Sequence, residues 1–301
     1  MRVRVLALFS ALALWLIAAM PANASSEGHS YLALGDSVSF GFSPLLDPTN
    51  AANFTGYPEI VAQRLNIEDV NPACSGEATG SFISLTGLDN SCRAYRFGSP
   101  INPPLPLHVS YTGTQLAFAV NYLKHNQRTR LVTLMLDAND FFRVSSGKPG
   151  TPWPPSTCFV PDLVTYFATC AVQNLKTILA AVRGTGYRGL LVIVTYYALN
   201  YSDPLGVFVT HDLLNAAMLT ASAGFKVRVA DGYGALKAAA APFGGDSCKA
   251  GLLIVTSASP LVCDVHPTPK GRDLLAGAVV KAVADSCNAG SAIGCLNRNR
   301  A

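Results

Sequence analysis

The sequence lacks several features that mark common classes of function. It contains no block of lysines and arginines, and its formal net charge is only +4. A nearly neutral chain of this kind predicts no nucleic-acid partner and no binding to an anionic membrane surface. The eight cysteines and five histidines include no CxxC or HxxxH spacing, so the pattern does not indicate a zinc site. We therefore expect neither a metal nor another cofactor.

Long apolar runs are also missing, except at the start of the chain. Arg2 and Arg4 precede an apolar run from Val5 to Met20, and small residues follow in Pro21-Ala-Asn-Ala24. This pattern is typical of a secretory signal peptide, and the alternative is an uncleaved membrane anchor. We predict cleavage after residue 24, which leaves a secreted, single-domain chain of residues 25–301 with a net charge of +2 and no stable membrane anchor.

The even number of cysteines behind this segment indicates disulfide bonds formed in an oxidising compartment. Sequential pairing would close short local loops, and each bond would contribute about 2–4 kcal/mol to stability. The pairs predicted in this way are Cys74–Cys92, Cys158–Cys170, Cys248–Cys263 and Cys287–Cys295. With every cysteine paired, we expect no catalytic thiol.

Short apolar runs alternate with segments of helical spacing after Ser25, which is typical of a parallel sheet covered by helices. The predicted strands are Tyr31–Leu34, Ile67–Asn71, Leu131–Leu136, Leu190–Thr195 and Val227–Ala230. Apolar residues at helical offsets predict helices around 116–123, 175–182 and 270–284. The sequence therefore predicts an α/β fold, a three-layer α/β/α sandwich with a five-stranded parallel sheet. Two proline-rich stretches, 85–109 and 142–161, either shape a cleft or cover the sheet edge.

A small polar triplet, Gly35-Asp36-Ser37, stands where the first predicted strand ends. In a parallel α/β sheet, ligands bind outside the carboxyl ends of the strands, so a serine there can present its hydroxyl and its backbone N–H to them. The position alone is more often structural. A second triplet, Gly245-Asp246-Ser247, follows Pro242 instead of a strand and precedes Cys248, which predicts a stapled loop.

Four blocks, taken together, resemble the SGNH or GDSL hydrolase family. The first is Gly35-Asp36-Ser37, and the second is Asn71-Pro-Ala-Cys-Ser-Gly-Glu-Ala-Thr79. The third is Asp137-Ala-Asn139-Asp140, where the family usually has Gly-x-Asn-Asp, and the fourth is Cys263-Asp264-Val265-His266-Pro267, where it usually has Asp-x-x-His-Pro. They occur in the family's order. The flanking Gly113-Thr-Gln-Leu-Ala117 and Thr195-Tyr-Tyr197 are similar to a secreted bacterial esterase subgroup.

The resemblance implies a flavodoxin-like fold and a role for each block. Ser37 would be the nucleophile and His266 the general base. The backbone N–H groups of Ser37 and Gly76 and the side-chain amide of Asn139 would form the oxyanion hole. The family's acid would fall on Cys263, so either Asp264 or a backbone carbonyl would orient His266. No role beyond adjusting the turn is expected for Asp137.

We therefore expect a secreted, metal-independent serine esterase or lipase that acts on small-molecule or lipid esters as a monomer. The alternatives are a carbohydrate acetyl esterase on the same fold and a catalytically silent surface-binding protein. The chain has only two tryptophans, one of them in the predicted signal, which favours lipid or simple esters over sugars. Phe141, Phe142 and Trp153 either wall an acyl pocket or pack in the core. His29, His108, His125 and His211 lie outside the blocks and are interpreted as surface or packing residues.

Overall fold

The computed structural model describes residues 28–98, 105–146 and 162–286. The predicted signal peptide, Trp153, and the cysteines at 158, 287 and 295 lie outside the described residues. Among the helices in the described ranges, none is long and apolar enough to cross a membrane.

The centre of the structure is a five-stranded parallel sheet in the order β2-β1-β3-β4-β5. Its strands are β1 (Ser30–Gly35), β2 (Glu68–Val70), β3 (Thr129–Met135), β4 (Leu190–Val194) and β5 (Val227–Ala230). The predicted sheet is confirmed, with boundaries shifted by one or two residues. Because β2 lies on one side of β1 and β3 lies on the other, the strand order reverses between β1 and β3. Such a switch point is where open α/β sheets form their ligand crevice.

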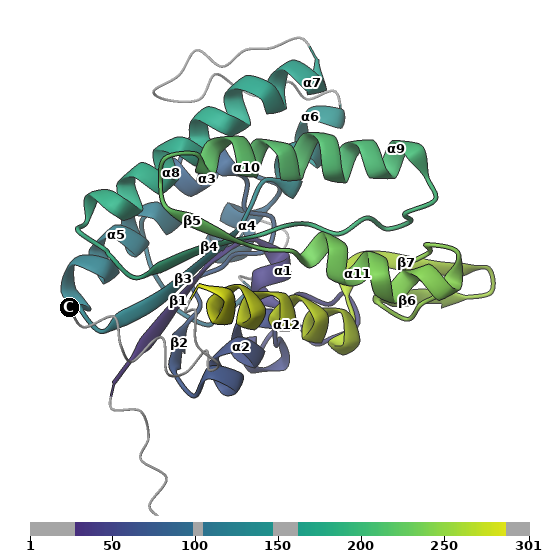
Figure 1. Ribbon diagram of the computed structural model, residues 1–301, viewed down its shortest axis with the longest axis horizontal. Helices are drawn as coiled ribbons and strands as arrows, with labels where there is room; N and C mark the ends of the chain where they lie inside the picture. Colours follow the sequence, from purple (N-terminus) through teal and green to yellow (C-terminus); the bar gives the residue numbers. More distant parts are fainter. Residues whose placement is uncertain (1–27, 99–104, 147–161, 287–301) are drawn as a thin grey trace, which may run out of the picture.

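Helices cover both faces of the sheet (Figure 1). The long helices of the lower layer in this view are α2 (Tyr57–Leu65), α11 (Gly232–Ala240) and α12 (Pro269–Asp285). The upper layer contains α5 (Gln115–His125), α8 (Val172–Gly184) and α10 (Ala216–Ser222). The apolar stripe of α8 that the sequence predicts is fully buried against the sheet, as its spacing requires. The predicted three-layer architecture is therefore correct.

Shorter elements connect these layers, and several surround the carboxyl ends of the strands. They are α1 (Ser37–Phe40), η1 (Ala51–Asn53), α3 (Thr79–Ile83), α4 (Cys92–Phe97), α6 (Ala138–Ser145), α7 (Leu163–Tyr166), η2 (Phe167–Ala171), α9 (Pro204–Val207), η3 (Phe208–Asn215) and η4 (Ala241–Phe243). The stretches predicted as irregular contain α4 and the end of α6, so that prediction holds only in part. The segments η2 and η3 are π-helical and continue directly into α8 and α10.

A two-stranded antiparallel hairpin, β6 (Leu253–Ala258) and β7 (Leu261–Pro267), lies outside the main sheet, and β7 contacts α1 and α12 (Figure 1). The sequence analysis did not predict it. A half-buried strand is recognised in a sequence by apolar residues that alternate with polar ones, the apolar residues facing the core. In this hairpin the apolar residues Val255, Leu261 and Val262 are exposed, so the sequence does not show that alternation. This hairpin matters for function because β7 carries the fourth sequence block.

Two of the predicted disulfide bonds are present among the described residues. Cys74 pairs with Cys92 at a Cα separation of 5.7 Å, and Cys248 pairs with Cys263 at 5.8 Å. Each closes a short loop, of 18 and 15 residues, next to one of the sequence blocks. The predicted pairs 158–170 and 287–295 include residues outside the described ranges and stay predictions.

Candidate active site

Ser37 begins the short helix α1 directly after β1. Asp36 caps this helix, because its side chain accepts a hydrogen bond from the Val38 N–H at 3.0 Å. As the first helical residue, Ser37 has a backbone N–H without an acceptor inside the helix. Gly35 makes the exit from the strand possible, since its φ is +153° and a Cβ there would lie 2.4 Å from the Met135 carbonyl oxygen. Sequence and sterics therefore place the Ser37 hydroxyl and its N–H at the crevice.

A cavity of about 550 Å³ opens at this point. Its lining includes Ser37, Gly76, Asn139 and His266, which come from all four sequence blocks. The segments α6, β4–α9 and α9–η3 also line it. They contribute the apolar side chains Phe141, Phe142, Leu199, Leu205, Val209 and Leu214 and the polar side chains Asn200, Asp203 and Thr210.

Gly76 and Asn139 are locked together on one wall of the cavity. Gly76 has a φ of +82°, and a Cβ on it would lie 2.0 Å from the Asn90 carbonyl oxygen, so only glycine fits. The Asn139 amide donates to the Glu77 carbonyl oxygen at 3.0 Å and its Oδ1 accepts from Asn90 Nδ2 at 3.0 Å. An amide has two N–H donors, so one remains for an oxygen inside the cavity. With the Ser37 N–H, this wall can supply three donors to a developing oxyanion.

His266 lies near the end of β7 and forms a hydrogen-bonded pair with Asp264. The contact joins His266 Nδ1 to Asp264 Oδ1, and the same carboxylate oxygen accepts the His266 backbone N–H at 2.9 Å. Burial opposes ionisation of Asp264, but the hydrogen bonds and charge of His266 outweigh it and hold the Asp264 pKa below its usual range. A carboxylate on Nδ1 favours the tautomer in which Nε2 is free to accept a proton.

The ring of His266 is steadied on its other side by Phe42. Their centroids are 5.0 Å apart in an edge-to-face arrangement. Ser37 and His266 line the same cavity, although no direct hydrogen bond joins their side chains in the described part of the chain. Catalytic hydrogen bonds are often long before substrate binds. The alternatives for orienting His266 were Asp264 and a backbone carbonyl. In the structure Asp264 contacts the imidazole, and Cys263 is bonded to Cys248.

Three buried carboxyl groups, Asp36, Asp137 and Asp140, belong to the first and third sequence blocks, and of these Asp36 lines the cavity. Burial raises the pKa of Asp36 to about 6, against the opposing hydrogen bond from Tyr196. Asp140 is fully buried, yet it accepts hydrogen bonds from the Thr79 N–H and hydroxyl at 2.8 and 2.7 Å and from Tyr166. Asp137 replaces the family's usual glycine and has a φ of 123°. Both its carboxyl oxygens are buried without a hydrogen-bond partner, and burial raises its pKa.

Residues that the sequence analysis set aside lie away from the cavity. Ser247 is fully buried and donates to the Ala198 carbonyl oxygen at 2.8 Å, and its neighbour Cys248 is in a disulfide, as the stapled-loop interpretation predicts. His108 contacts the Phe40 carbonyl oxygen at 3.0 Å and His125 that of Asn121 at 2.8 Å. His211 pairs with Asp212 on η3 at 2.7 Å. None of these residues, nor His29, lines the cavity described above.

Sequence reasoning missed three residues that support the site: Asn90, Gln115 and Tyr196. Asn90 holds Asn139, and Tyr196 donates to Asp36. Gln115 bonds both backbone groups of Gly35, accepting from its N–H at 2.8 Å and donating to its carbonyl oxygen at 2.9 Å. Gln115 and Tyr196 lie in the two flanking segments that are similar to the secreted bacterial esterase subgroup, whereas Asn90 lies in neither. No spacing in the sequence links any of the three to its partner.

The five-stranded fold, with the four blocks around one cavity, is the arrangement that the resemblance implies. The chain belongs to the GDSL-like lipase/acylhydrolase family, whose model matches residues 33–274. No curated protein matches the sequence. Among solved structures, the fold is similar to LAE5, an alpha/beta hydrolase enzyme from the metagenome of Lake Arreo, Spain, with 17% identity, a TM-score of 0.51 and coverage of 90% of this chain and 97% of that one.

A second similar structure is Axe2, an acetylxylan esterase from Geobacillus stearothermophilus. Its identity to this chain is 16% and the TM-score is 0.50, with coverage of 85% of this chain and 94% of that one. At these identities the likeness establishes the α/β fold. The family match supports the class of carboxylic ester hydrolases.

Proposed function

We propose that the protein is a serine esterase or lipase in which Ser37 is the nucleophile, His266 the general base and Asp264 the residue that orients it. The observation that carries this proposal is the Asp264–His266 pair on the same cavity as Ser37. A nucleophile, an oriented base and preorganised donors are the three requirements for ester hydrolysis at neutral pH. The family match supports the reaction class independently of this geometry.

In the first half of the reaction, Ser37 Oγ attacks the ester carbonyl carbon and its proton moves to His266 Nε2. The carbonyl oxygen becomes an oxyanion that accepts hydrogen bonds from the N–H groups of Ser37 and Gly76 and from the Asn139 amide. When the tetrahedral intermediate collapses, the bond to the alcohol oxygen breaks and His266 gives that oxygen its proton. Water then attacks the acyl-enzyme, passing its proton through His266 to Ser37 Oγ, and the carboxylic acid leaves.

The apolar residues of the cavity lining support an acyl chain as the group bound there. Among them are Phe141, Leu205 and Val209, which lie on α6, α9 and η3. Burying one methylene group is worth about 0.8 kcal/mol, which corresponds to about a fourfold change in kcat/KM for each carbon that fits. We therefore favour lipid or simple esters with an extended acyl chain over acetyl esters of carbohydrates.

Hydrolysis of p-nitrophenyl esters of increasing chain length tests both the reaction and the substrate class. We expect kcat/KM to rise from the acetate to about the octanoate, and Ser37→Ala to abolish turnover without unfolding the protein. Val209→Phe, which places a larger side chain in the cavity lining, should lower kcat/KM for the octanoate and leave that for the acetate largely unchanged. A preference for acetate together with release of acetate from acetylated xylo-oligosaccharides would favour the carbohydrate esterase. No hydrolysis of any ester would favour a silent binding protein.

We also propose that the protein is secreted after cleavage near Ala24. The two disulfide bonds among the described residues support an extracellular location, because such bonds persist in oxidising compartments. Sequencing the amino terminus of protein recovered from the medium of an expressing bacterium tests this proposal. A terminus at or near Ser25 is expected, and retention of Met1 in a membrane fraction would contradict it.

A further inference from the structure

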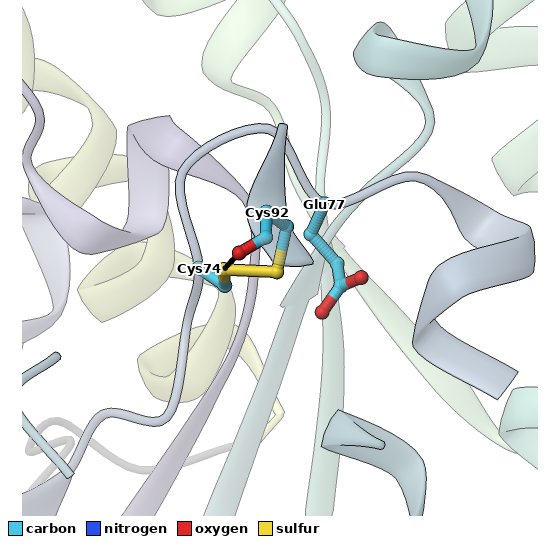
Figure 2. Close-up of side chains that lie close together, drawn as sticks. All are labelled: Cys74, Glu77 and Cys92. Carbon is cyan, nitrogen blue, oxygen red and sulfur yellow. Dashed lines mark hydrogen bonds between the residues drawn. A yellow bond between two sulfur atoms is a disulfide. The ribbon is translucent and has the colours of Figure 1, made fainter. Parts of the chain in front are cut away.

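Glu77 is a buried acid that the reaction outlined above does not use. It directly follows Gly76, and only 1% of its surface is exposed. Figure 2 shows its carboxyl group beside the Cys74–Cys92 disulfide. Although three potential metal-ligating groups meet there, both sulfurs are bonded to each other, and metals bind thiolates. The chemistry of this cluster therefore rests on the carboxyl group.

Glu77 connects the parts of the site that form the oxyanion hole. Its backbone carbonyl oxygen accepts from the Asn139 amide at 3.0 Å. Its side-chain Oε2 accepts from Gln115 Nε2 at 3.1 Å, and Gln115 in turn bonds both the N–H and the carbonyl oxygen of Gly35. A continuous series of hydrogen bonds thus runs from the residue two before Ser37, through Glu77, to Asn139.

The contacts of Glu77 can all be satisfied when its carboxyl group is neutral. Ser81 Oγ lies within hydrogen-bond distance of Glu77 Oε1, and it also contacts the Ala78 carbonyl oxygen at 3.2 Å and the Ala78 N–H at 3.1 Å. If the Glu77 carboxyl group is protonated, Ser81 Oγ can accept a hydrogen bond from it and donate one to the Ala78 carbonyl oxygen. Oε2 still accepts from Gln115. Protonation therefore leaves no buried donor or acceptor unpaired.

An ionised Glu77 would place a negative charge on the residue that follows Gly76 and that binds the Asn139 amide through its carbonyl oxygen, and the reaction develops a negative charge at the donors of Gly76 and Asn139. The charged and titratable groups that face Glu77 are Arg96 on α4, Asp89 in the preceding loop and Tyr111 before α5. Burial raises the pKa of Glu77 to about 7, with opposing effects from the Ser81 and Gln115 hydrogen bonds and from Arg96. Two negative charges held in a buried site repel strongly, so the reaction favours the neutral acid.

We propose that Glu77 is a positioning residue for the oxyanion hole that works in its neutral form and weakens the hole when it ionises. This inference rests on the proposed ester hydrolysis. Glu77 is neutral below its pKa and charged above it. We therefore expect kcat/KM to decrease on the alkaline side of the pH profile as Glu77 ionises.

Glu77→Gln tests the proposal, because the amide keeps an acceptor for Gln115 and gives Ser81 a donor but cannot ionise. We expect kcat/KM of the wild type and the variant to agree within about threefold at pH 6. Above pH 8 the wild type should fall roughly tenfold below the variant, the size expected for one buried charge acting on the oxyanion at short range. The matched control is Glu59→Gln. Glu59 is a half-buried acid with a raised pKa that lies outside the cavity, so this variant should keep the alkaline decrease in activity of the wild type.

A second variant protects the test against a failure of Glu77→Gln to fold. Asp89 raises the pKa of Glu77, so Asp89→Asn should make Glu77 ionise more readily and move the alkaline limb to lower pH. A ratio of wild type to Glu77→Gln that stays constant from pH 6 to pH 9, or an unmoved limb in Asp89→Asn, overturns the role of Glu77. Absence of ester hydrolysis by the wild type at every pH instead overturns the proposed function.

Discussion

The two halves of the candidate site are built in different ways. Ser37, Gly76 and Asn139 follow the sheet edge at the switch point between β1 and β3, and buried hydrogen bonds through Gln115, Glu77 and Asn90 join them. His266 and Asp264 lie on β7, in a hairpin that shares no strand pairing with the main sheet.

The hairpin half is held by a different set of contacts. The Cys248–Cys263 disulfide fixes the base of β7, Tyr197 donates to the Val265 carbonyl oxygen at 2.8 Å, and Phe42 packs against the imidazole. The nucleophile and oxyanion half is therefore part of the core, whereas the base half is attached to it. We expect substitutions of His266 and Asp264 to alter the reaction more than loss of one oxyanion donor, and substitutions in the residues that support them to alter activity before they unfold the protein.

After Ser37→Ala, the largest effect is expected from His266→Ala. Removing the base of a serine hydrolase typically lowers kcat by about 10⁶ because the nucleophile is no longer activated. The structure offers a matched control in His211→Ala, which removes another histidine paired with an aspartate but outside the cavity. Turnover of p-nitrophenyl butyrate measures both variants. Equal activity of the two would show that the hairpin half takes no part in the reaction.

Asp264→Asn is expected to have the next largest effect, a fall in kcat of about 10⁴, because an amide favours the wrong imidazole tautomer. KM should change much less. The structure makes Asp264 the only carboxylate among the described residues that is hydrogen-bonded to His266. Steady-state kinetics with unchanged circular dichroism would establish the result. A loss of less than about tenfold would point to a serine–histidine dyad oriented by a backbone group.

Asn139→Ala probes the opposite half and should cost less, about 10² to 10³ in kcat, the usual loss for one oxyanion donor. The two N–H donors of Ser37 and Gly76 would remain. Comparing this loss with that of Asp264→Asn in the same assay ranks the two halves directly. If Asn139→Ala raised KM and left kcat unchanged, the residue would bind substrate and not the transition state.

The smallest effect on catalysis should come from removing a disulfide, and here the two halves should differ. Replacing either pair by serines should lower the free energy of unfolding by about 2–4 kcal/mol, since the two loops have similar lengths. At temperatures well below unfolding, loss of Cys248–Cys263 should lower kcat more than loss of Cys74–Cys92. The reason is that the hydrogen bonds of Glu77 and Asn90 also fix the loop between Cys74 and Cys92. Urea denaturation and kinetics on the same samples check both parts. A greater loss of kcat in the Cys74–Cys92 variant would contradict the comparison.

The sheet-edge half is the part that the sequence predicts best. Buried strands produce continuous apolar runs, and parallel strands gather their carboxyl ends at one edge, so Ser37 and Asn139 could be placed together from their positions alone. The local disulfides could be predicted for a similar reason, because short loops limit the partners that a cysteine can reach. These inferences need only the order of elements along the chain.

The hairpin and the supporting hydrogen bonds could not be predicted in this way. The strands β6 and β7 expose apolar side chains, so their pattern does not separate a buried face from a solvent face. Gln115 reaches Gly35 across 80 residues of sequence, and Asn90 reaches Asn139 across 49. Such contacts depend on the packing of whole layers. Asp137 differs again: its buried, unpaired carboxyl group and positive φ contradict ordinary propensity, and nothing in the structure explains the choice of aspartate.

Reaction with a p-nitrophenyl alkylphosphonate tests the activation of Ser37 by His266 most directly. The phosphorus is attacked by an activated serine, nitrophenol leaves, and the stable adduct resembles the tetrahedral intermediate. We predict one adduct, located by mass spectrometry on the peptide that contains Ser37, with a rate that falls at least about 100-fold in His266→Ala. An adduct on another residue, or an equal rate in the two proteins, would contradict the account.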